Sequence, residues 1–507
     1  MYSLLQLSNL DIKQTKINFN NGNGINNKSK QPSVKISKTT ISGNIENGIV
    51  LSGALSTVIE SCWIGTDEAG TASLGNGGFG IRILDDSTAL DVSHNVVAHN
   101  VAGGISVTDS DSNSFSYNVV DQNGGAGFTV NNSDANTFTA NASTRNIGAG
   151  FVVAGSDAVA LDGNFIGTDE SGTADLGNGG DGVNITGGSD GVISGGNVVA
   201  FNSGVGISAD GATELTVSGN TIARNESDGL ALLGITEAIV SGNWIGTDAT
   251  ASADWGNGGY GVRIADDATD LAVEGNVVSH NISGGFRVTA AADSSFAENV
   301  VDDNGGVGIL VEGGSSNVFT GNAVIRNLGT GVALNLADTT TLSGNVIGTG
   351  PSGTEQWGNF GDGISIVGGG SDVADDGNVV AFNVGAGVSV NGGVSHAVSQ
   401  NAVHHNSGIG VRVFGGVTGL GVTGNTVDHN GLIGINVVAS DGNSVSANIV
   451  TDNNGSGVLL DTATMTAVSG NTVGPERRVR DRAHRVGRQH PQRQHGRSEH
   501  WGRNLGG

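Results

Sequence analysis

Residues 403–429 hold the densest group of side chains suited to proton transfer, namely His404, His405, Arg412, Asp428 and His429. An imidazole beside a carboxylate can act as a general base, and an arginine can neutralise a substrate carboxylate. A lyase or epimerase of an acidic polysaccharide needs both functions to remove the proton next to a sugar carboxylate. These five residues are therefore predicted to form a catalytic site. The competing interpretation is a solvated row of charges without catalytic function.

A second group of residues is predicted to bind a polysaccharide. Its histidine, its arginine and one aspartate recur at one position of a repeat, and the other aspartate lies beside them. Its tryptophans lie in or beside insertions, where indole faces can stack on sugar rings. The alternatives are a multivalent charged surface and simple packing of the insertions against the body. The candidate substrate-binding residues are His280, Asp302, Asp303, Arg326, Trp244, Trp255 and Trp357.

The insertions also contain Asp67, Asp169 and Asp248, which are candidate Ca²⁺ ligands together with loop carbonyl groups. Calcium prefers six to eight oxygen ligands in a flexible arrangement. The competing interpretation is a turn in which each aspartate hydrogen-bonds its own backbone. Two features favour that turn: Gly350 replaces the aspartate in the fourth insertion, and the spacing of known calcium loops is absent.

All these residues belong to a repeat that is clearest at 215–232, LTVSGNTIARNESDGLAL. Its first Asn, at 220, recurs every 23 residues along most of the chain. One step is 24 residues, from 401 to 425, and the steps after positions 62, 164, 243 and 345 are 33. A fixed period of this length is typical of a solenoid.

Each repeat contains short segments in which apolar and polar residues alternate, which predicts strands with one buried face. One coil cannot bury its apolar face alone, but stacked coils can. The Asn residues are predicted to form an internal hydrogen-bonded ladder between coils. The return segment is too rich in glycine for the helix of a leucine-rich repeat, and from Thr39 to Gly474 the single proline, Pro351, lies in an insertion.

This pattern resembles the right-handed parallel β-helix of the pectate-lyase-like superfamily over residues 33–474. The insertions WIGTDEAGTASLGNGG (63–78), FIGTDESGTADLGNGG (165–180), WIGTDATASADWGNGG (244–259) and VIGTGPSGTEQWGNFG (346–361) resemble I-G-T-D…G-N loops of bacterial secreted or surface β-helix proteins. The resemblance implies an all-β, single-domain solenoid and raises carbohydrates above other ligands. The Asp-Pro-His-Asp motif of mannuronan epimerases is absent from the sequence.

A second, longer repeat spans several coils, because residues 64–220 match residues 245–401 at an offset of 181. This match indicates an internal duplication. Since the four insertions occupy the same corner of their coils, they are predicted to project from one side of the rod.

Charge divides the chain into three parts, in which the central one carries seven Arg against 44 Asp and Glu, a net charge of −37. Such an acidic body excludes nucleic acid as a partner and suits an extracellular or cell-surface location. Residues 1–32 are predicted to be a cap or truncated first coils, and residues 33–474 the β-helix. The Arg-rich residues 475–507 have the character of a shifted reading frame and are predicted to lie outside the fold. No signal peptide or transmembrane segment is visible, and one cysteine, Cys62, excludes a disulfide framework.

Three hypotheses for function follow. The first is an extracellular rod that binds polysaccharide or a cell-surface glycan along the face with the insertions, with or without Ca²⁺. The second is a polysaccharide lyase or epimerase with its site at 404–429. The third is a structural stalk or adhesin.

Overall fold

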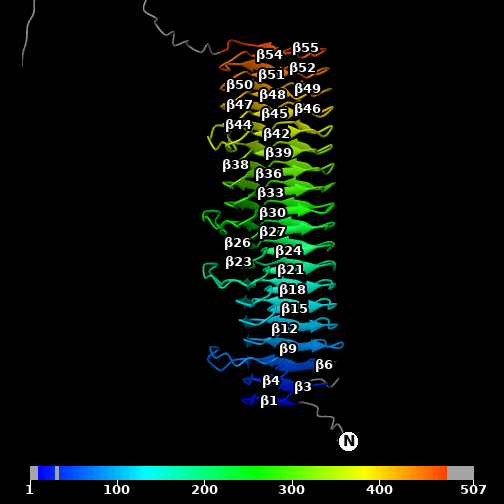
Figure 1. The fold of residues 1–507 in the computed structure, drawn as a ribbon, viewed down its shortest axis with the longest axis vertical. Helices are drawn as coiled ribbons and strands as arrows, with labels where there is room; N and C mark the ends of the chain where they lie inside the picture. Colours follow the sequence, from blue (N-terminus) through cyan, green and yellow to red (C-terminus); the bar gives the residue numbers. More distant parts are fainter. Residues whose placement is uncertain (1–9, 29–33, 477–507) are drawn as a thin grey trace, which may run out of the picture.

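The computed structural model describes residues 10–28 and 34–476, which form 56 β-strands and no helix. The strands follow one another in sets of three, and the resulting coils stack into a long rod (Figure 1). The first coil contains β1 (Asp11–Lys13), β2 (Lys16–Asn18) and β3 (Ile25–Asn27). The last strands are β55 (Ala467–Ser469) and β56 (Thr472–Val473). Within this described part, no helix is long and apolar enough to cross a membrane.

Each strand pairs in parallel with the strand three positions later, which gives three sheets that run along the rod. We call them sheet A (β1, β4 and onward), sheet B (β2, β5 and onward) and sheet C (β3, β6 and onward). In sheet A, Ala272 of β31 (Ala272–Glu274) is in register with Ser295 of β34 (Ser295–Ala297), 23 residues later. The repeat period of the sequence is therefore the pairing register, and the predicted parallel β-helix is confirmed.

The core is a column of apolar side chains enclosed by the three sheets. In most three-residue strands the central side chain points inward, as Val273 of β31 and Phe296 of β34 do, and both are almost fully buried. Each such side chain contributes about 1.5–3 kcal/mol when it leaves water. The apolar column therefore holds successive coils together.

Two ladders of buried asparagines run through the rod. In the first, which the sequence predicts, Asn95 Nδ2 donates to Asn118 Oδ1 at 3.0 Å and to the carbonyl oxygen of Ile59 at 2.8 Å. The same pattern continues to Asn471. A second ladder starts at Asn20, whose Nδ2 donates to Asn44 Oδ1 at 2.7 Å, and Asn44 Nδ2 donates in turn to Asn76 Oδ1 at 2.7 Å. The side-chain amides thus satisfy polar backbone groups that turn into the core at two corners.

Just before the second ladder, at the end of sheet B, one residue per coil projects outward; we call this set the outer column. Its members have φ between +51° and +62°, a left-handed conformation that costs a non-glycine residue about 1–2 kcal/mol. This conformation directs the next residue, the buried asparagine, into the core. The side chain of the outer-column residue itself stays partly or fully exposed. The outer column comprises His99, Gln122, Arg145, Phe201, Arg224, His280, Asp303, Arg326, Phe382, His405, His429 and Asp452.

The ends of the chain are described only in part. Residues 10–28 form a coil that pairs with the next one, so the described portion of residues 1–32 has the same structure as the body. Most of the Arg-rich tail, residues 477–507, lies outside the described residues. Cys62 is buried at the position of the first ladder, and burial raises the pKa of its thiol to about 11.

A buried acid–base pair interrupts the corner between sheets C and A. Asp372 and His396 lie on successive coils, and each is at most 1% exposed. Asp372 Oδ1 accepts from the Thr340 amide at 3.0 Å, whereas its Oδ2 lies 3.6 Å from His396 Nδ1 and has no hydrogen-bond partner. Burial raises the pKa of Asp372 to about 7 and lowers the pKa of His396, so both side chains favour their neutral forms.

Replacing Asp372 with asparagine will therefore stabilise the protein at alkaline pH. The unfolded carboxyl group loses its proton near pH 4 and the folded one near pH 7, so wild-type stability falls as the pH rises through this window. We expect Asp372→Asn to raise the free energy of unfolding by about 1–3 kcal/mol at pH 8, with little change at pH 4, where the window begins. Denaturant unfolding at both pH values measures the difference. Equal effects at the two values would contradict a neutral buried Asp372.

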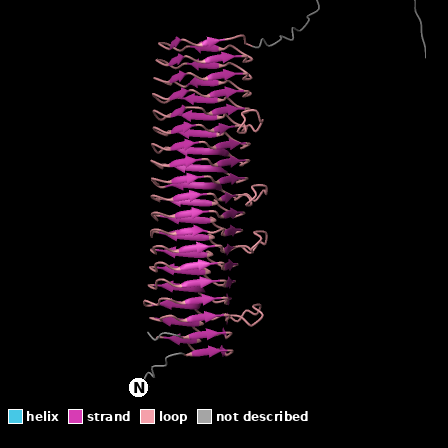
Figure 2. Cartoon of the chain, turned by 180° about the vertical axis from the view of Figure 1, so that it is seen from behind, coloured by secondary structure: helices cyan, strands magenta, loops and turns pink. Residues whose placement is uncertain are grey.

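The four insertions project from one side of the rod, as the sequence predicts (Figures 1 and 2). We name them loop I (63–78), loop II (165–180), loop III (244–259) and loop IV (346–361). Each starts in a two-residue strand of sheet B: β8 (Trp63–Ile64), β20 (Phe165–Ile166), β29 (Trp244–Ile245) and β41 (Val346–Ile347). The outer column therefore lies in the same face as the loops.

Candidate ligand-binding face

The loop aspartates are used by the loops themselves. Asp67 Oδ1 accepts from the amides of Thr71 and Ala72 at 3.0 and 3.2 Å, and Asp248 Oδ1 accepts from the amide of Ser252 at 2.9 Å. These backbone hydrogen bonds lower the pKa of both carboxyl groups. In loop II the hydroxyl group of Ser171 donates to Asp169 at 2.7 Å and is the main cause of the lowered pKa of Asp169. Each carboxylate thus closes its own turn.

Loop IV keeps a carboxylate although Gly350 replaces the aspartate. Glu355 Oε2 accepts from the Ser352 hydroxyl at 2.6 Å and from the Thr354 amide at 3.2 Å. A residue from the other side of the turn therefore supplies the missing acceptor. Loop IV therefore takes its carboxylate from Glu355, not from position 350, and keeps the turn.

Loops II and III contact each other through Arg224 of the outer column. Its guanidinium lies 4.4 Å from the centre of the Trp255 indole and 5.1 Å from the Phe201 ring. Its Nη1 donates to the carbonyl oxygen of Gly172 in loop II at 3.4 Å. Three coils separate these two loops, whereas four separate loops III and IV, so a gap opens beyond Trp255.

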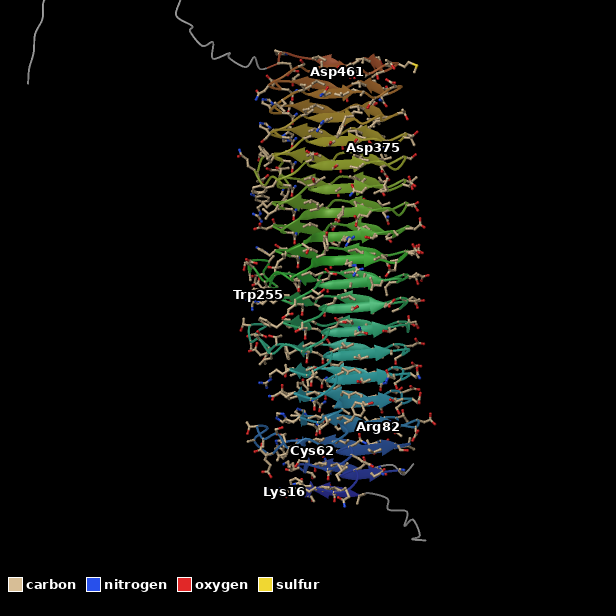
Figure 3. The ribbon with its side chains drawn as sticks, viewed as in Figure 1. Lys16, Cys62, Arg82, Trp255, Asp375 and Asp461 are labelled. Atoms are coloured by element: carbon tan, nitrogen blue, oxygen red, sulfur yellow. The ribbon has the colours of Figure 1, made fainter. Side chains whose placement is uncertain are left out.

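That gap is a hollow of about 680 Å³, which we call the central hollow. Trp255 lies on the side of the rod from which the loops project (Figure 3). Across the hollow, His280 Nε2 lies 3.8 Å from Asp303 Oδ2, and apolar Ile282 and Leu328 are exposed. Its lining is Arg224, Asp254, Trp255, Gly256, His280, Ile282, Asp303, Gly305 and Leu328.

Beside the central hollow, Arg326 forms a fixed positive group. Its Nε donates to Asp302 Oδ1 at 2.8 Å, its Nη2 also donates to this carboxylate, and the pair raises the pKa of Arg326. The guanidinium lies 5.4 Å from the centre of the Trp357 indole in loop IV. An Arg–Trp contact therefore occurs at each end of the segment between loops III and IV.

The structure places three of the seven residues predicted to bind substrate in the central hollow and three more in a group beside it. His280, Asp303 and Trp255 line the central hollow, and Asp302, Arg326 and Trp357 lie next to it. Trp244 lies in β29, between Thr221 and Val277 of neighbouring strands, and is absent from the lining. Arg224, which the sequence analysis did not select, belongs to the same outer column as His280 and Arg326.

Four of the five residues predicted as catalytic line a second hollow of about 620 Å³ above loop IV, which we call the histidine hollow. His404 ends β47 (Ala402–His404) and pairs in register with Asp428, which ends β50 (Thr426–Asp428). His405 and His429 follow them in the outer column. Their rings are parallel, with centroids 4.9 Å apart, and Phe382 stacks on the other face of His405 at 5.1 Å.

Short contacts connect the three histidines and Asp428 of this hollow. His404 Nδ1 lies 3.1 Å from His405 Nδ1, and the two rings are nearly perpendicular. His429 Nδ1 lies 3.5 Å from Asp428 Oδ1. Burial lowers the pKa of His404 and outweighs the opposing effect of Asp428. The hollow therefore offers neutral imidazole nitrogen next to a carboxylate.

Arg412 is separate from this group. It lies in β48 (Val411–Phe414) of sheet C, past the corner of the coil, and its guanidinium packs 4.0 Å from the Phe414 ring centre. Among the described residues that line the histidine hollow, none is lysine or arginine. The group that the catalytic hypothesis assigned to a substrate carboxylate therefore lies on another sheet.

The duplicated segment provides an internal comparison. The ion pair of Arg145 with Asp121 (Nε–Oδ1 2.8 Å) repeats that of Arg326 with Asp302. However, Leu74 and Leu176 stand where the second copy has Trp255 and Trp357. The backbone is equivalent, because the amides of Leu74 and Trp255 donate to Gly65 and Gly246 at 3.1 and 3.2 Å. The tryptophans are therefore specific to the second copy and are not required by the loop fold.

This chain is similar to several solved structures at low sequence identity. A search of curated proteins finds no match. Similar solved structures include the A-module of a mannuronan C-5 epimerase from Azotobacter vinelandii, with 14% identity, coverage of 67% of this chain and 88% of that one, and a TM-score of 0.37. DFA-IIIase from Arthrobacter chlorophenolicus A6 has 14% identity, 67% and 85% coverage and a TM-score of 0.31. A periplasmic alginate epimerase has 10% identity, 79% and 77% coverage and a TM-score of 0.30.

Two family models match the sequence. The model described as periplasmic copper-binding protein (NosD) matches residues 71–226, which do not include the histidine hollow. The model described as right handed beta helix region matches residues 171–322, 247–380 and 355–474. Together these three matches span more than half of the chain, and they agree with the three parallel sheets of the structure. The chain therefore belongs to the right-handed β-helix family.

Proposed function

We propose that the protein binds a polysaccharide along the face that carries the loops, with the central hollow as the main contact. The observation that carries this proposal is the combination of Trp255, Ile282 and Leu328 with His280 and Asp303 in one open hollow. A sugar ring has an apolar face of C–H groups and an edge of hydroxyl groups, and the hollow offers a partner to each. We place the protein outside the cytoplasm, where such a glycan is available.

The length of the face favours a polymer over a single sugar. Loops III and IV are four coils apart, which at about 4.8 Å per coil places the Trp255 and Trp357 regions roughly 20 Å apart. Further hollows lie around loop I and above loop IV on the same face. Repeated shallow sites along a line suit repeated sugar units.

Electrostatics favours a neutral glycan. The central part of the chain carries a net charge of −37, and Asp254 and Asp303 line the hollow itself. Like charges repel a polyuronate chain, and this repulsion is reduced by salt or by a bridging divalent cation. We therefore expect neutral polysaccharides to bind at low salt and polyuronates to bind only when Ca²⁺ is added.

Affinity electrophoresis through gels that contain neutral or uronate polysaccharides, with and without Ca²⁺, tests the proposal. Trp255→Leu and Trp357→Leu install the residues found at the equivalent positions 74 and 176, so the loops should keep their fold. We expect each change to weaken retention by about threefold to tenfold, because it removes an aromatic stacking surface. His280→Ala, which removes a residue that lines the hollow, should also weaken retention, whereas the matched control His99→Ala should leave retention unchanged.

Each other outcome has a clear meaning. Equal retention of wild-type protein and both tryptophan variants would overturn the central hollow as the binding site. No retention on any polysaccharide would favour the hypothesis that the rod is a structural stalk or adhesin. An increase in ultraviolet absorbance with polyuronates would indicate unsaturated products and hence a lyase.

A further inference from the structure

We propose that His404, His405 and Asp428 form a binding site for a divalent transition-metal ion such as Zn²⁺. This proposal concerns the histidine hollow and does not depend on polysaccharide binding at the central hollow. One ligand atom from each of the three residues lies within 4.8 Å of those from the other two. In the part of the chain that the structure describes, this is the only such group of three or more His, Cys, Asp or Glu side chains.

The geometry suits a small metal ion. Nitrogen ligands about 2.0–2.1 Å from a tetrahedral zinc ion lie roughly 3.3 Å from each other. His404 Nδ1 and His405 Nδ1 are 3.1 Å apart, and their rings are nearly perpendicular, so both lone pairs can be directed at one point between them. Asp428 is the in-register neighbour of His404 in the next coil and adds an oxygen ligand from the side.

The surroundings hold these ligands in place. Phe382 stacks on one face of His405 and His429 on the other, at 5.1 and 4.9 Å. His404 is anchored because the strand alternation buries its neighbour Val403 in the core. A rigid arrangement of this kind lowers the conformational entropy that metal binding must overcome.

The ligand set selects the class of metal. Two imidazole nitrogens and one carboxylate oxygen favour Zn²⁺, Ni²⁺ or Cu²⁺, whereas Ca²⁺ and Mg²⁺ prefer oxygen ligands only. His429 lies beside Asp428, and its buried Nδ1 has no hydrogen-bond partner. Three protein ligands leave at least one coordination position that faces the open hollow and can accept water or a ligand hydroxyl group.

Isothermal titration of the full chain with Zn²⁺ tests the proposal, with Mg²⁺ and Ca²⁺ as comparison ions. We expect the tightest Zn²⁺ site of the wild-type protein to weaken by more than about tenfold in His404→Ala, His405→Ala and Asp428→Asn. The matched control is His280→Ala, which removes a histidine of the outer column that also lies beside an aspartate. It should leave this site unchanged.

The tail histidines His484, His490, His495 and His500 are present in every variant, so any zinc that they bind cancels in the comparison. Thermal unfolding without metal verifies that each variant is folded, and Asp428→Asn, which keeps the side-chain shape, remains informative if a histidine variant is not. Unchanged Zn²⁺ affinity in folded variants of the three residues would overturn the site and leave a hydrogen-bonded histidine pair. An equal loss in His280→Ala would also overturn it, because binding would then be nonspecific.

Discussion

Replacing Asn299 with alanine will lower the free energy of unfolding by about 3–5 kcal/mol, although the change removes only one small polar side chain. Asn299 lies in the middle of the first ladder and is 1% exposed. Its Oδ1 accepts from the backbone amide and from Nδ2 of Asn276 at 3.0 and 2.9 Å. Its Nδ2 donates to the carbonyl oxygen of Val273 at 2.9 Å and to Asn322 Oδ1 at 3.0 Å.

The cost is large because alanine leaves partners on both neighbouring coils without a hydrogen bond. A buried donor or acceptor that loses its partner costs about 1–3 kcal/mol, and the packed core gives water no route to replace it. Asn299→Asp should be as harmful at neutral pH, because a carboxylate cannot donate to Val273 or to Asn322. This second variant separates the loss of donors from the loss of volume.

Chemical denaturation measures the effect, and hydrogen exchange of the amides in residues 276–322 locates it. The control is Asn335→Ala in β39 (Val332–Asn335), because this asparagine lies on the outer surface and should change stability by less than about 0.5 kcal/mol. If Asn299→Ala and Asn335→Ala unfolded at the same denaturant concentration, the ladder would contribute nothing to the stability of the rod.

The first ladder also shows why so much of the fold is predictable from the sequence. A strand that pairs with a copy of itself one period later places like residues above like residues, so the spacing of Asn276 and Asn299 is at once a sequence pattern and a register. The same logic places loops I to IV on one side of the rod. The second ladder follows the same rule, because its asparagines also recur once per coil.

The candidate site was less predictable, because contacts across the face depend on how many coils separate two features. His405 and Arg412 are seven residues apart, yet a corner of the coil lies between them and directs them to different sheets. Conversely, Arg224 and Gly172 are 52 residues apart and form a hydrogen bond. Asp67 follows the simpler rule of a local turn, since its carboxylate accepts from two backbone amides four and five residues later.

Replacing a phenylalanine of the core is the second change that we expect to lower the free energy of unfolding strongly. Phe115 and Phe138 stack at 4.7 Å on sheet A, and Phe128 and Phe151 stack at 4.4 Å on sheet C. The two stacks meet edge to face, with Phe138 at 5.4 Å from Phe128 and at 5.5 Å from Phe151. All four rings are fully buried. In the duplicated segment Phe296 and Phe319 keep the first stack, whereas Ile309 and Val332 replace the second.

We expect Phe138→Ala to cost about 4–6 kcal/mol, because it opens a cavity and also removes one parallel and two edge-to-face ring contacts. Phe319→Ala is the matched comparison, since it opens a similar cavity but faces aliphatic Ile309 and Val332; its cost should be smaller by about 0.5–1.5 kcal/mol. Phe138→Leu should cost less than either alanine variant, because leucine fills most of the space. Denaturant unfolding of the three variants measures the order. Equal costs for Phe138→Ala and Phe319→Ala would mean that volume alone stabilises this part of the core, and that the edge-to-face contacts between the two stacks add nothing.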